Sequence, residues 1–176
     1  SKFKTQVNAK YAFYRTHYVN NDDKLIHVDN LYKQREIYLS SANVYSILSN
    51  WDVSASYDLQ WNKMNADMYG FVYPERFTNL LSVATALRLG KVKLQASGLA
   101  TFINDRVEEG PAPEARQILT PAVFASYKPF EKQDFNVRAF YKRIFRMPTF
   151  NDLYYADMGN SKLNPEYVTQ YDAGFA

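Results

Sequence analysis

The residues of this chain that could do chemistry are few, and the most suggestive group lies near the N-terminus. Two histidines, His17 and His27, stand close in sequence to the acidic residues Asp22, Asp23 and Asp29. Imidazole and carboxylate groups bind divalent metals, so a metal site could be assembled from these residues. Their spacing fits no established ligand motif, however, and a solvated acidic loop is the simpler interpretation.

Catalytic residue types form no recognisable arrangement. The chain has no cysteine, which excludes disulfides, zinc–thiolate sites and thiol nucleophiles. It contains no glycine-rich phosphate loop, no nucleophile elbow and no paired carboxylates. The acidic pair Glu108 and Glu109 stands beside Gly110 and Pro111, which is typical of a loop tip. We therefore expect no enzyme activity, no catalytic residues, and neither a cofactor nor a bound metal.

The composition favours strands and disfavours nucleic-acid binding. Aromatic residues make up 16% of the 176 residues, with 15 Tyr and 12 Phe against only 6 Gly, and aromatic side chains suit the pleated surface of a sheet. The 21 basic and 18 acidic residues are mixed along the chain, whereas nucleic-acid-binding domains gather Lys and Arg on one face. The one basic run with interleaved aromatics, residues 138–146, alternates at close to period two and is typical of a strand.

Alternation of apolar and polar residues is the dominant pattern. From residue 51 to residue 62 every odd position is apolar and every even position is polar. A helix would place Asp52 and Ala55 on the same side, so a strand is required to separate the two sets. We expect Leu59 and its apolar companions Val53, Tyr57 and Trp61 to face lipid. The polar set, which includes Asp58 and Gln60, is then the wetted wall of a barrel lumen.

Weaker alternation elsewhere predicts about eight strands. They cover residues 3–13, 31–48, 51–61, 81–89, 92–102, 119–127, 135–141 and 168–176. Several have ten or more residues, whereas strands of soluble proteins have about five or six and transmembrane strands about nine to eleven. Because Pro121 cannot donate a ladder hydrogen bond, we expect it near a strand start or a bulge.

The predicted connections alternate strictly between long and short. The long ones are residues 19–30, 63–76, 104–116 and 147–167, and the short ones are residues 49–50, 90–91 and 128–133. An antiparallel meander with long loops on one rim and short turns on the other is the organisation of bacterial outer-membrane barrels. Aromatic residues near the predicted strand ends, such as Trp51, Trp61 and Tyr127, match the aromatic girdles of these barrels.

Residues 145–166, FRMPTFNDLYYADMGNSKLNPE, closely resemble a signature of TonB-dependent outer-membrane receptors. In that family a strand ends in a Phe-Arg-x-Pro element, which is followed by Leu-Tyr, Gly-Asn and Leu-x-Pro-Glu elements. The matching positions are Phe145, Arg146, Pro148, Leu153, Tyr154, Gly159, Asn160, Leu163, Pro165 and Glu166, then Tyr171 and Gly174. The segments WNKMNADMYGF and RAFYKRIF also resemble such barrels, which extends the resemblance to the whole chain.

The signature also has a physical interpretation as a loop between two strands. Pro148 and Pro165 stop ladder pairing at its two ends, and Gly159 with Asn160 supplies a turn. We therefore expect the signature residues to fix the shape of the loop, with direct contact to a ligand as the alternative.

The resemblance implies an all-β fold, an antiparallel up-and-down meander belonging to a 22-stranded transmembrane β-barrel. Residues 1–176 would be a partial barrel domain, without the plug domain and the remaining strands. The implied function is TonB-energised uptake of a scarce nutrient (a siderophore, corrinoid, haem, glycan or peptide) across the outer membrane of a Gram-negative bacterium. The implied partners are outer-membrane lipid, the nutrient, and the TonB protein through the absent plug region.

Two other architectures fit the same alternation. One is a complete small eight-stranded membrane barrel, and the other is a soluble lipocalin-like carrier whose apolar face points inward. No run of about 18 apolar residues predicts a transmembrane helix, and no signal peptide opens the chain, which suggests a mature or truncated form. As an isolated piece of a barrel, the chain would carry two unpaired edges and an apolar face without lipid. In water we therefore expect it either to self-associate or to turn its apolar face inward.

Overall fold

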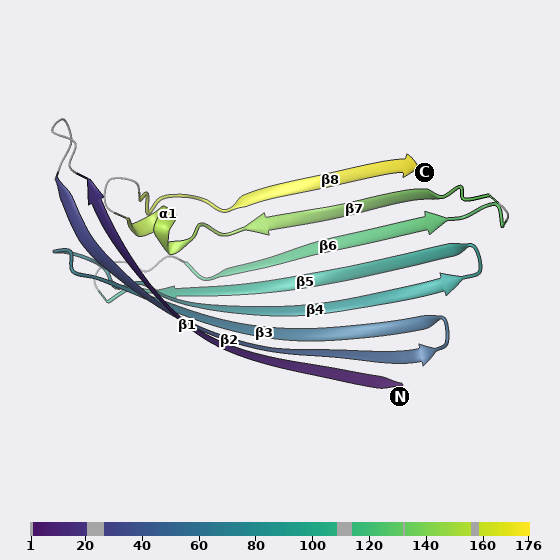
Figure 1. Ribbon diagram of the computed structural model, residues 1–176, viewed down its shortest axis with the longest axis horizontal. Coiled ribbons are helices and arrows are strands. Elements are labelled where there is room, and N and C mark those ends of the chain that lie inside the picture. Colours follow the sequence, from purple (N-terminus) through teal and green to yellow (C-terminus); the bar gives the residue numbers. More distant parts are fainter. Residues whose placement is uncertain (1, 21–26, 109–113, 132, 156–158) are drawn as a thin grey trace.

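The computed structural model describes residues 2–20, 27–108, 114–131, 133–155 and 159–176. Within these ranges eight strands form one antiparallel sheet whose order in space is the order in the chain (Figure 1). The strands are β1 (Phe3–Asn20), β2 (Val28–Leu48), β3 (Trp51–Ala66), β4 (Glu75–Leu89), β5 (Val92–Arg106), β6 (Arg116–Tyr127), β7 (Val137–Arg146) and β8 (Glu166–Phe175). One five-residue helix, α1 (Phe150–Tyr154), lies between β7 and β8. The predicted antiparallel meander is confirmed.

The first five strands are longer than the sequence pattern predicts. Each has between 15 and 21 residues, because pairing continues into residues 63–66, 75–76 and 104–106, which we had expected in loops. At these ends the outer face is polar, and the inner face mixes the apolar Met64 and Ala66 with the charged Arg76 and Asp105. The period-two pattern is therefore lost there, although the backbone ladder is not. The three short connections do lie together at the opposite rim, as predicted (Figure 1).

The register between neighbouring strands assigns every strand residue to one of two faces. Register is continuous from β1 to β8, with one irregularity at Ser46 and Leu48. We call the face covered by α1 and its flanking residues the inner face, and the opposite face the outer face. As expected, the apolar set of β3 lies on the outer face, and the polar set from Asp52 to Asn62 lies on the inner face.

Large apolar side chains cover the outer face and remain accessible there. Val7 is 72% exposed, Leu119 65% and Tyr171 76%. This distribution argues against a soluble carrier, which would enclose its apolar face. In the described ranges each strand pairs only with its neighbours in sequence, so β1 and β8 do not meet and the sheet is not closed. A complete eight-stranded barrel would require that contact.

Two local expectations were wrong. Pro121 lies in the middle of β6, opposite Gly98, and not at a strand start or a bulge. The ladder between β6 and β7 begins at Ala122, so the proline stands where pairing on that side ends and its missing N–H is tolerated. Phe135 precedes β7, which begins at Val137. Among the described residues, no helix has the length and apolar character needed to cross a bilayer.

The turn between β4 and β5 depends on a glycine. Leu89 and Val92 are partners, which leaves Gly90 and Lys91 as a two-residue loop. Gly90 has a φ of 55°, the left-handed conformation that the first central residue of a type II′ turn requires. An L side chain in that conformation costs about 1–2 kcal/mol.

We predict that Gly90→Ala lowers the free energy of unfolding by about 1–2 kcal/mol, measured by urea titration in detergent micelles with tryptophan fluorescence. The matched control is Gly98→Ala, because Gly98 is a strand residue with no atom within 4 Å of an added Cβ and no left-handed φ. The control should be neutral or slightly stabilising. Equal losses in the two variants would contradict the assigned turn.

Candidate functional site

The signature loop begins with a capped helix. The Thr149 hydroxyl accepts a hydrogen bond from the Asp152 backbone N–H at 3.3 Å, and the Asp152 carboxylate accepts one from the Thr149 N–H at 2.8 Å, which together form a capping box. The hydrogen bonds that the Thr149 backbone N–H and hydroxyl donate to the Asp152 carboxylate, both 2.8 Å, lower the pKa of that carboxyl. Because this pKa is lower in the folded protein than in the unfolded chain, the stability that the cap contributes is fully present at a pH above the pKa of Asp152 in the unfolded chain. It is lost as the pH falls through the pKa of Asp152 in the folded protein.

The helix turns two apolar side chains toward the inner face of the sheet. Phe150 and Leu153, one turn apart, are both buried. Phe150 joins Tyr32 of β2, Met64 of β3 and Phe71 in the only cluster of buried apolar residues among those described. Beside them the Tyr155 ring stacks on Tyr32 with 4.3 Å between ring centroids. The loop therefore has its own small core against the sheet.

A buried ion pair connects this core to the sheet. Arg76 of β4 and Asp105 of β5 are cross-strand partners, and two hydrogen bonds of 2.7 and 2.6 Å join the guanidinium to the carboxylate. A third nitrogen of Arg76 donates to the carbonyl of Pro148 at 2.7 Å, and the guanidinium lies 5.1 Å from the centroid of the Phe150 ring. The Asp105 side chain is only 3% exposed. Arg76 thus holds the first turn of the loop on the inner face.

The structure places the predicted signature residues in two groups. Pro148 and Leu153 are buried beneath the loop, and Tyr154 is partly buried, which raises the pKa of its phenol. The others lie at the solvent side, where a cavity of about 170 Å³ is lined by Arg146, Pro148, Asp152, Leu163, Asn164 and Glu166. Arg146 is exposed and lies 3.8 Å from Asp152 and 3.6 Å from Glu166. Pro165 is half-buried next to them.

The turn of the described residues lies at Ser161 and Lys162, where the Leu163 N–H donates to the Asn160 carbonyl at 3.2 Å, and Gly159 precedes it. The Gly159 N–H donates to the carbonyl of Tyr155 at 2.7 Å, and the Asn160 N–H donates to that of Asp152 at 2.8 Å. A Cβ on Gly159 would lie 2.5 Å from the Tyr155 carbonyl oxygen. Close backbone approach, and not a left-handed φ, therefore excludes a side chain here.

Of the remaining sequence candidates for a metal site, the structure describes His17, His27 and Asp29. His17 and Asp29 lie on neighbouring strands, and Nε2 of the histidine is 2.6 Å from the carboxylate. Asp22, Asp23 and Glu109 lie outside the described residues. Within the described ranges, no three His, Cys, Asp or Glu side chains gather as a metal site would require.

Several hollows lie over the inner face, one of about 330 Å³ beside Tyr32 and Glu36. The largest of them, about 570 Å³, lies over small side chains including Ser54, Ala84, Ser97 and Ala122. The second, about 400 Å³, is bounded by Gln60 and Asn62 of the sheet and by Thr149 and Phe150 of the loop. The side-chain oxygen of Asn62 is buried there without a hydrogen-bond partner among the described residues. The inner face therefore offers polar groups beside the signature loop.

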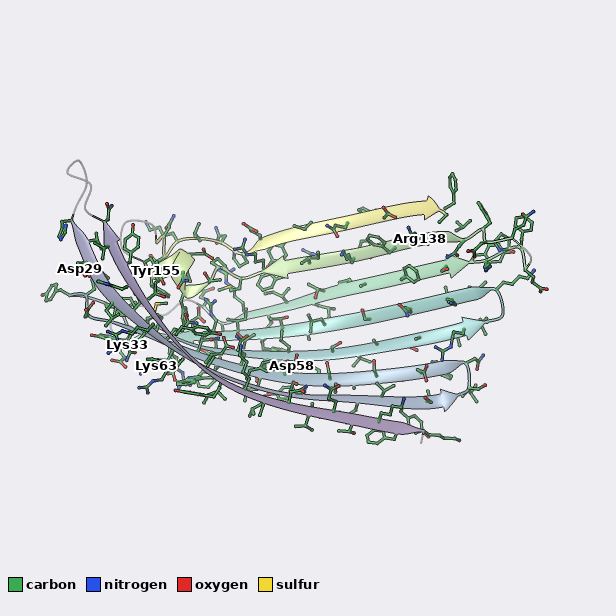
Figure 2. The ribbon with its side chains drawn as sticks, viewed as in Figure 1. Asp29, Lys33, Asp58, Lys63, Arg138 and Tyr155 are labelled. Carbon is green, nitrogen blue, oxygen red and sulfur yellow. The ribbon has the colours of Figure 1, made fainter. Side chains whose placement is uncertain are left out.

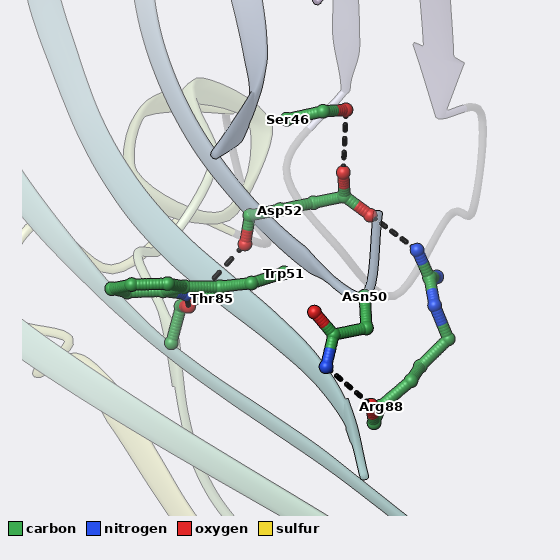
Figure 3. A network of polar contacts seen from close by, with 6 residues as sticks. All are labelled: Ser46, Asn50, Trp51, Asp52, Thr85 and Arg88. Atoms are coloured by element: carbon green, nitrogen blue, oxygen red, sulfur yellow. Dashed lines mark hydrogen bonds and ion pairs between the residues drawn. The ribbon is translucent and has the colours of Figure 1, made fainter. Parts of the chain in front are cut away.

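A network of polar contacts lies on the inner face at the rim of the short turns (Figure 3). The Asp52 carboxylate accepts hydrogen bonds from Ser46 at 2.6 Å and from Arg88 at 2.7 Å. Asn50 donates to the carbonyl of Arg88 at 3.0 Å. These contacts join β2, β3 and β4 where the two turns emerge, on the side opposite the exposed apolar residues.

The outer face carries an apolar band with a sharp edge toward the long connections. Toward the long connections the band ends on β1 to β6 at Phe13, Ile37, Trp61, Phe77, Phe102 and Leu119. The next residues on that face are Arg15, Arg35, Lys63, Glu75, Asn104 and Gln117. Beyond this edge, Val19 of β1 and Leu31 of β2 are the apolar residues on the outer face of these six strands. At this edge the Trp61 indole N–H donates to Glu75 at 2.6 Å, so the tryptophan has an apolar body and a satisfied polar tip.

This edge crosses the sheet obliquely. From Phe13 on β1 to Leu119 on β6 it moves by six positions of the register over five strand gaps. At about 3.3 Å per residue and about 4.8 Å per gap, the slope is about 40°, the tilt of strands in membrane barrels. The ten-residue rise from Trp51 to Trp61 on β3, tilted by this angle, gives a band about 25 Å tall.

Comparison with known proteins agrees with this geometry. The family model described as TonB dependent receptor-like, beta-barrel matches residues 1–176. The chain belongs to this family. It is a family of receptors and transporters of the outer membrane of Gram-negative bacteria, and not of enzymes. A comparison with curated proteins gives no match.

A solved structure, the copper transporter OprC, is similar to this TonB-dependent receptor barrel segment with a TM-score of 0.70 and 13% sequence identity. The similarity covers 98% of this chain and 33% of that chain. At this identity the match shows a shared fold. The chain spans about a third of the length of OprC.

Sequence reasoning found the signature loop but missed its anchor. Neither Arg76 nor Asp105 was a candidate, because they lie 29 positions apart and nothing in the sequence pairs them. The ion pair can be recognised only once the register is known, because the register places the two opposite charges directly across from each other on β4 and β5.

We predict that Arg76→Gln lowers the free energy of unfolding by about 3–5 kcal/mol, because Asp105 is left buried without its partner. It should also expose the loop after β7 to limited proteolysis. The control is Arg88→Gln, which breaks a more exposed ion pair of 2.7 Å with Asp52 and should cost about 0–1 kcal/mol. If both variants lose the same stability, or if the loop stays protected, Arg76 is not its anchor.

Proposed function

We propose that residues 1–176 are a barrel-wall domain of an outer-membrane receptor that imports a scarce nutrient with energy supplied by TonB. The observation that carries this proposal is the outer apolar band, whose slope and height match a membrane barrel. A water-exposed band of this size would be unusual for a soluble monomer. Contact with lipid on the outer face therefore explains why that face is apolar and the inner face is polar.

The proposal extends to a barrel of about 22 strands, as in large outer-membrane transporters. Eight strands are about a third of that number, and the chain spans 33% of OprC. In such a barrel the edges of β1 and β8 pair with further strands, and the plug, which would contact TonB, fills the lumen against the inner face. An isolated chain keeps both edges free, so self-association remains our expectation for it.

The nutrient is proposed only as a class: a siderophore complex, a corrinoid, haem, a glycan or a peptide. The signature residues Arg146, Pro148, Leu153, Tyr154, Gly159, Asn160, Leu163, Pro165 and Glu166 are proposed to shape the inner wall. Their packing supports this role, because the loop has its own buried core and the Arg76 anchor. Direct contact with cargo is better suited to the polar hollow between Asn62 and Thr149.

Membrane embedding can be tested on β4. Val83 is 52% exposed at the middle of the outer band and faces Ala55 and Gly98 on its neighbours, so an arginine has room there. We predict that Val83→Arg costs about 2–4 kcal/mol of unfolding free energy in lipid vesicles. Ser82→Arg, which adds the same charge on the inner face, should cost less. The reverse order would contradict the proposed orientation.

Transport can be tested in cells that lack the gene encoding this chain. We expect uptake of one nutrient of the proposed classes to fall to background, to return with the wild-type gene, and to fall again without TonB. Radiolabelled or fluorescent ferric siderophores, corrinoids, haem, glycans and peptides would be measured in parallel. Unchanged uptake of every class would contradict the proposed import function while leaving the barrel fold untouched.

A further inference from the structure

A groove runs along the inner face beside the signature loop. Two adjoining hollows, of about 400 and 330 Å³, form it, and they share the lining residues Gln34, Glu36, Thr149 and Phe150. Strands β1 to β5 supply its floor, and the start of the signature loop supplies one wall. It lies at the end of the sheet with the long connections, where Tyr155 marks its position in Figure 2. We call it the loop groove.

An amide in the floor of the loop groove has no partner. Asn62 is 8% exposed, and its side-chain oxygen is buried without a hydrogen bond to any described residue. Burying a carbonyl oxygen without a hydrogen bond is costly. A ligand that donates a hydrogen bond to this oxygen would remove the cost. The amide therefore points to an occupant of the groove.

Two more polar side chains of the groove are unused in the same way. Gln34 on β2 and Thr78 on β4 lie diagonally across from Asn62 on its two sides. Neither side chain forms a hydrogen bond within the described part of the chain. Diagonal neighbours on a sheet face are about 7–8 Å apart, so the three groups form a short oblique row. Amides and hydroxyls both donate and accept hydrogen bonds, as the hydroxyls of a sugar do.

The charges that line the loop groove are already paired. Among the described residues that line it, Glu36 and Arg76 carry charge. Lys10 donates to the Glu36 carboxylate at 3.0 Å, and Arg76 is bound by Asp105. Arg138, which has no ion pair in the described ranges, lies at the opposite end of the sheet (Figure 2). An anionic cargo would therefore meet no free cation in the described part of the groove.

We propose that the loop groove binds a neutral glycan, the nutrient that this receptor imports. The inference rests on the proposed function and narrows its five nutrient classes to one. Sugar hydroxyls satisfy the row of Gln34, Asn62 and Thr78, and the exposed ring of Tyr14 offers an apolar surface to the face of a sugar. Extended peptides bind by adding a strand at a sheet edge, whereas β2 to β5 under the groove are paired on both sides.

The experiment uses the full gene product that carries this chain, purified in detergent. Neutral hexasaccharides of glucose, mannose, galactose and xylose are titrated into it by isothermal calorimetry. Haem, a ferric catecholate complex, cobalamin and an uncharged hexapeptide are the probes for the other nutrient classes. We expect at least one hexasaccharide to bind and the other probes not to bind.

The variant Asn62→Leu should weaken hexasaccharide binding about ten-fold, because a buried hydrogen bond to the sugar is lost. Without glycan the same variant should resist urea at least as well as the wild type, because an unpaired buried oxygen has been removed. The matched control is Gln95→Leu, which removes an amide from the inner face outside the loop groove. It should bind the hexasaccharide as the wild type does.

Each other outcome overturns the inference. Unchanged binding in Asn62→Leu, or an equal loss in Gln95→Leu, would contradict the assigned site. Lower stability of Asn62→Leu without glycan would make the amide a structural group. Binding of another probe and of no hexasaccharide would overturn the glycan class and leave the import function standing. If no probe binds, the inference falls, and the uptake measurements in cells decide the proposed function separately.

Discussion

The continuous backbone ladder from β1 to β8 is the constraint on which the rest of this structure depends. Inside a bilayer, water cannot satisfy backbone N–H and C=O groups, so each strand must find its partners in its neighbours. The ladder holds side chains in strict alternation across seven strand pairs. Because a slip of one residue would exchange the two faces, the apolar band and the polar inner wall exist only while the register is kept.

Arg76 joins this periodic wall to its one irregular element. The backbone ladder does not position the segment after β7, and α1 is too short to be stable alone. The guanidinium satisfies Asp105, the Pro148 carbonyl and the face of Phe150 at once, so the segment lies on the inner face. One buried side chain thereby shapes the hollow next to Asn62 and Thr149.

The sequence predicted the strands whose two faces differ in polarity. It was less accurate where the structure depends on contacts between strands. Between Trp51 and Trp61 one face is apolar and the other polar, so the pattern reveals both the strand and its orientation. Beyond Lys63 the outer face is polar and the apolar residues Met64 and Ala66 lie on the inner face, so the ladder continues although the apolar set of the outer face has ended. Pro121 was misplaced because its tolerance depends on where β7 stops pairing. The signature loop was recognised from its residues, whereas its anchor is a pair that only the register brings together.

The contact between Arg76 and Pro148 has a consequence for how the wall assembles. All strand pairings join neighbours in the chain, so hairpins can form one after another with short closure distances, which favours rapid folding. The Arg76 hydrogen bond spans 72 residues, and it cannot form until three further strands, β5 to β7, have been added to the sheet. Until then the guanidinium of Arg76 has Asp105 as its partner but lacks the Pro148 carbonyl and the Phe150 ring. The inner face beside the signature loop therefore takes its final shape only after β4 to β7 have paired.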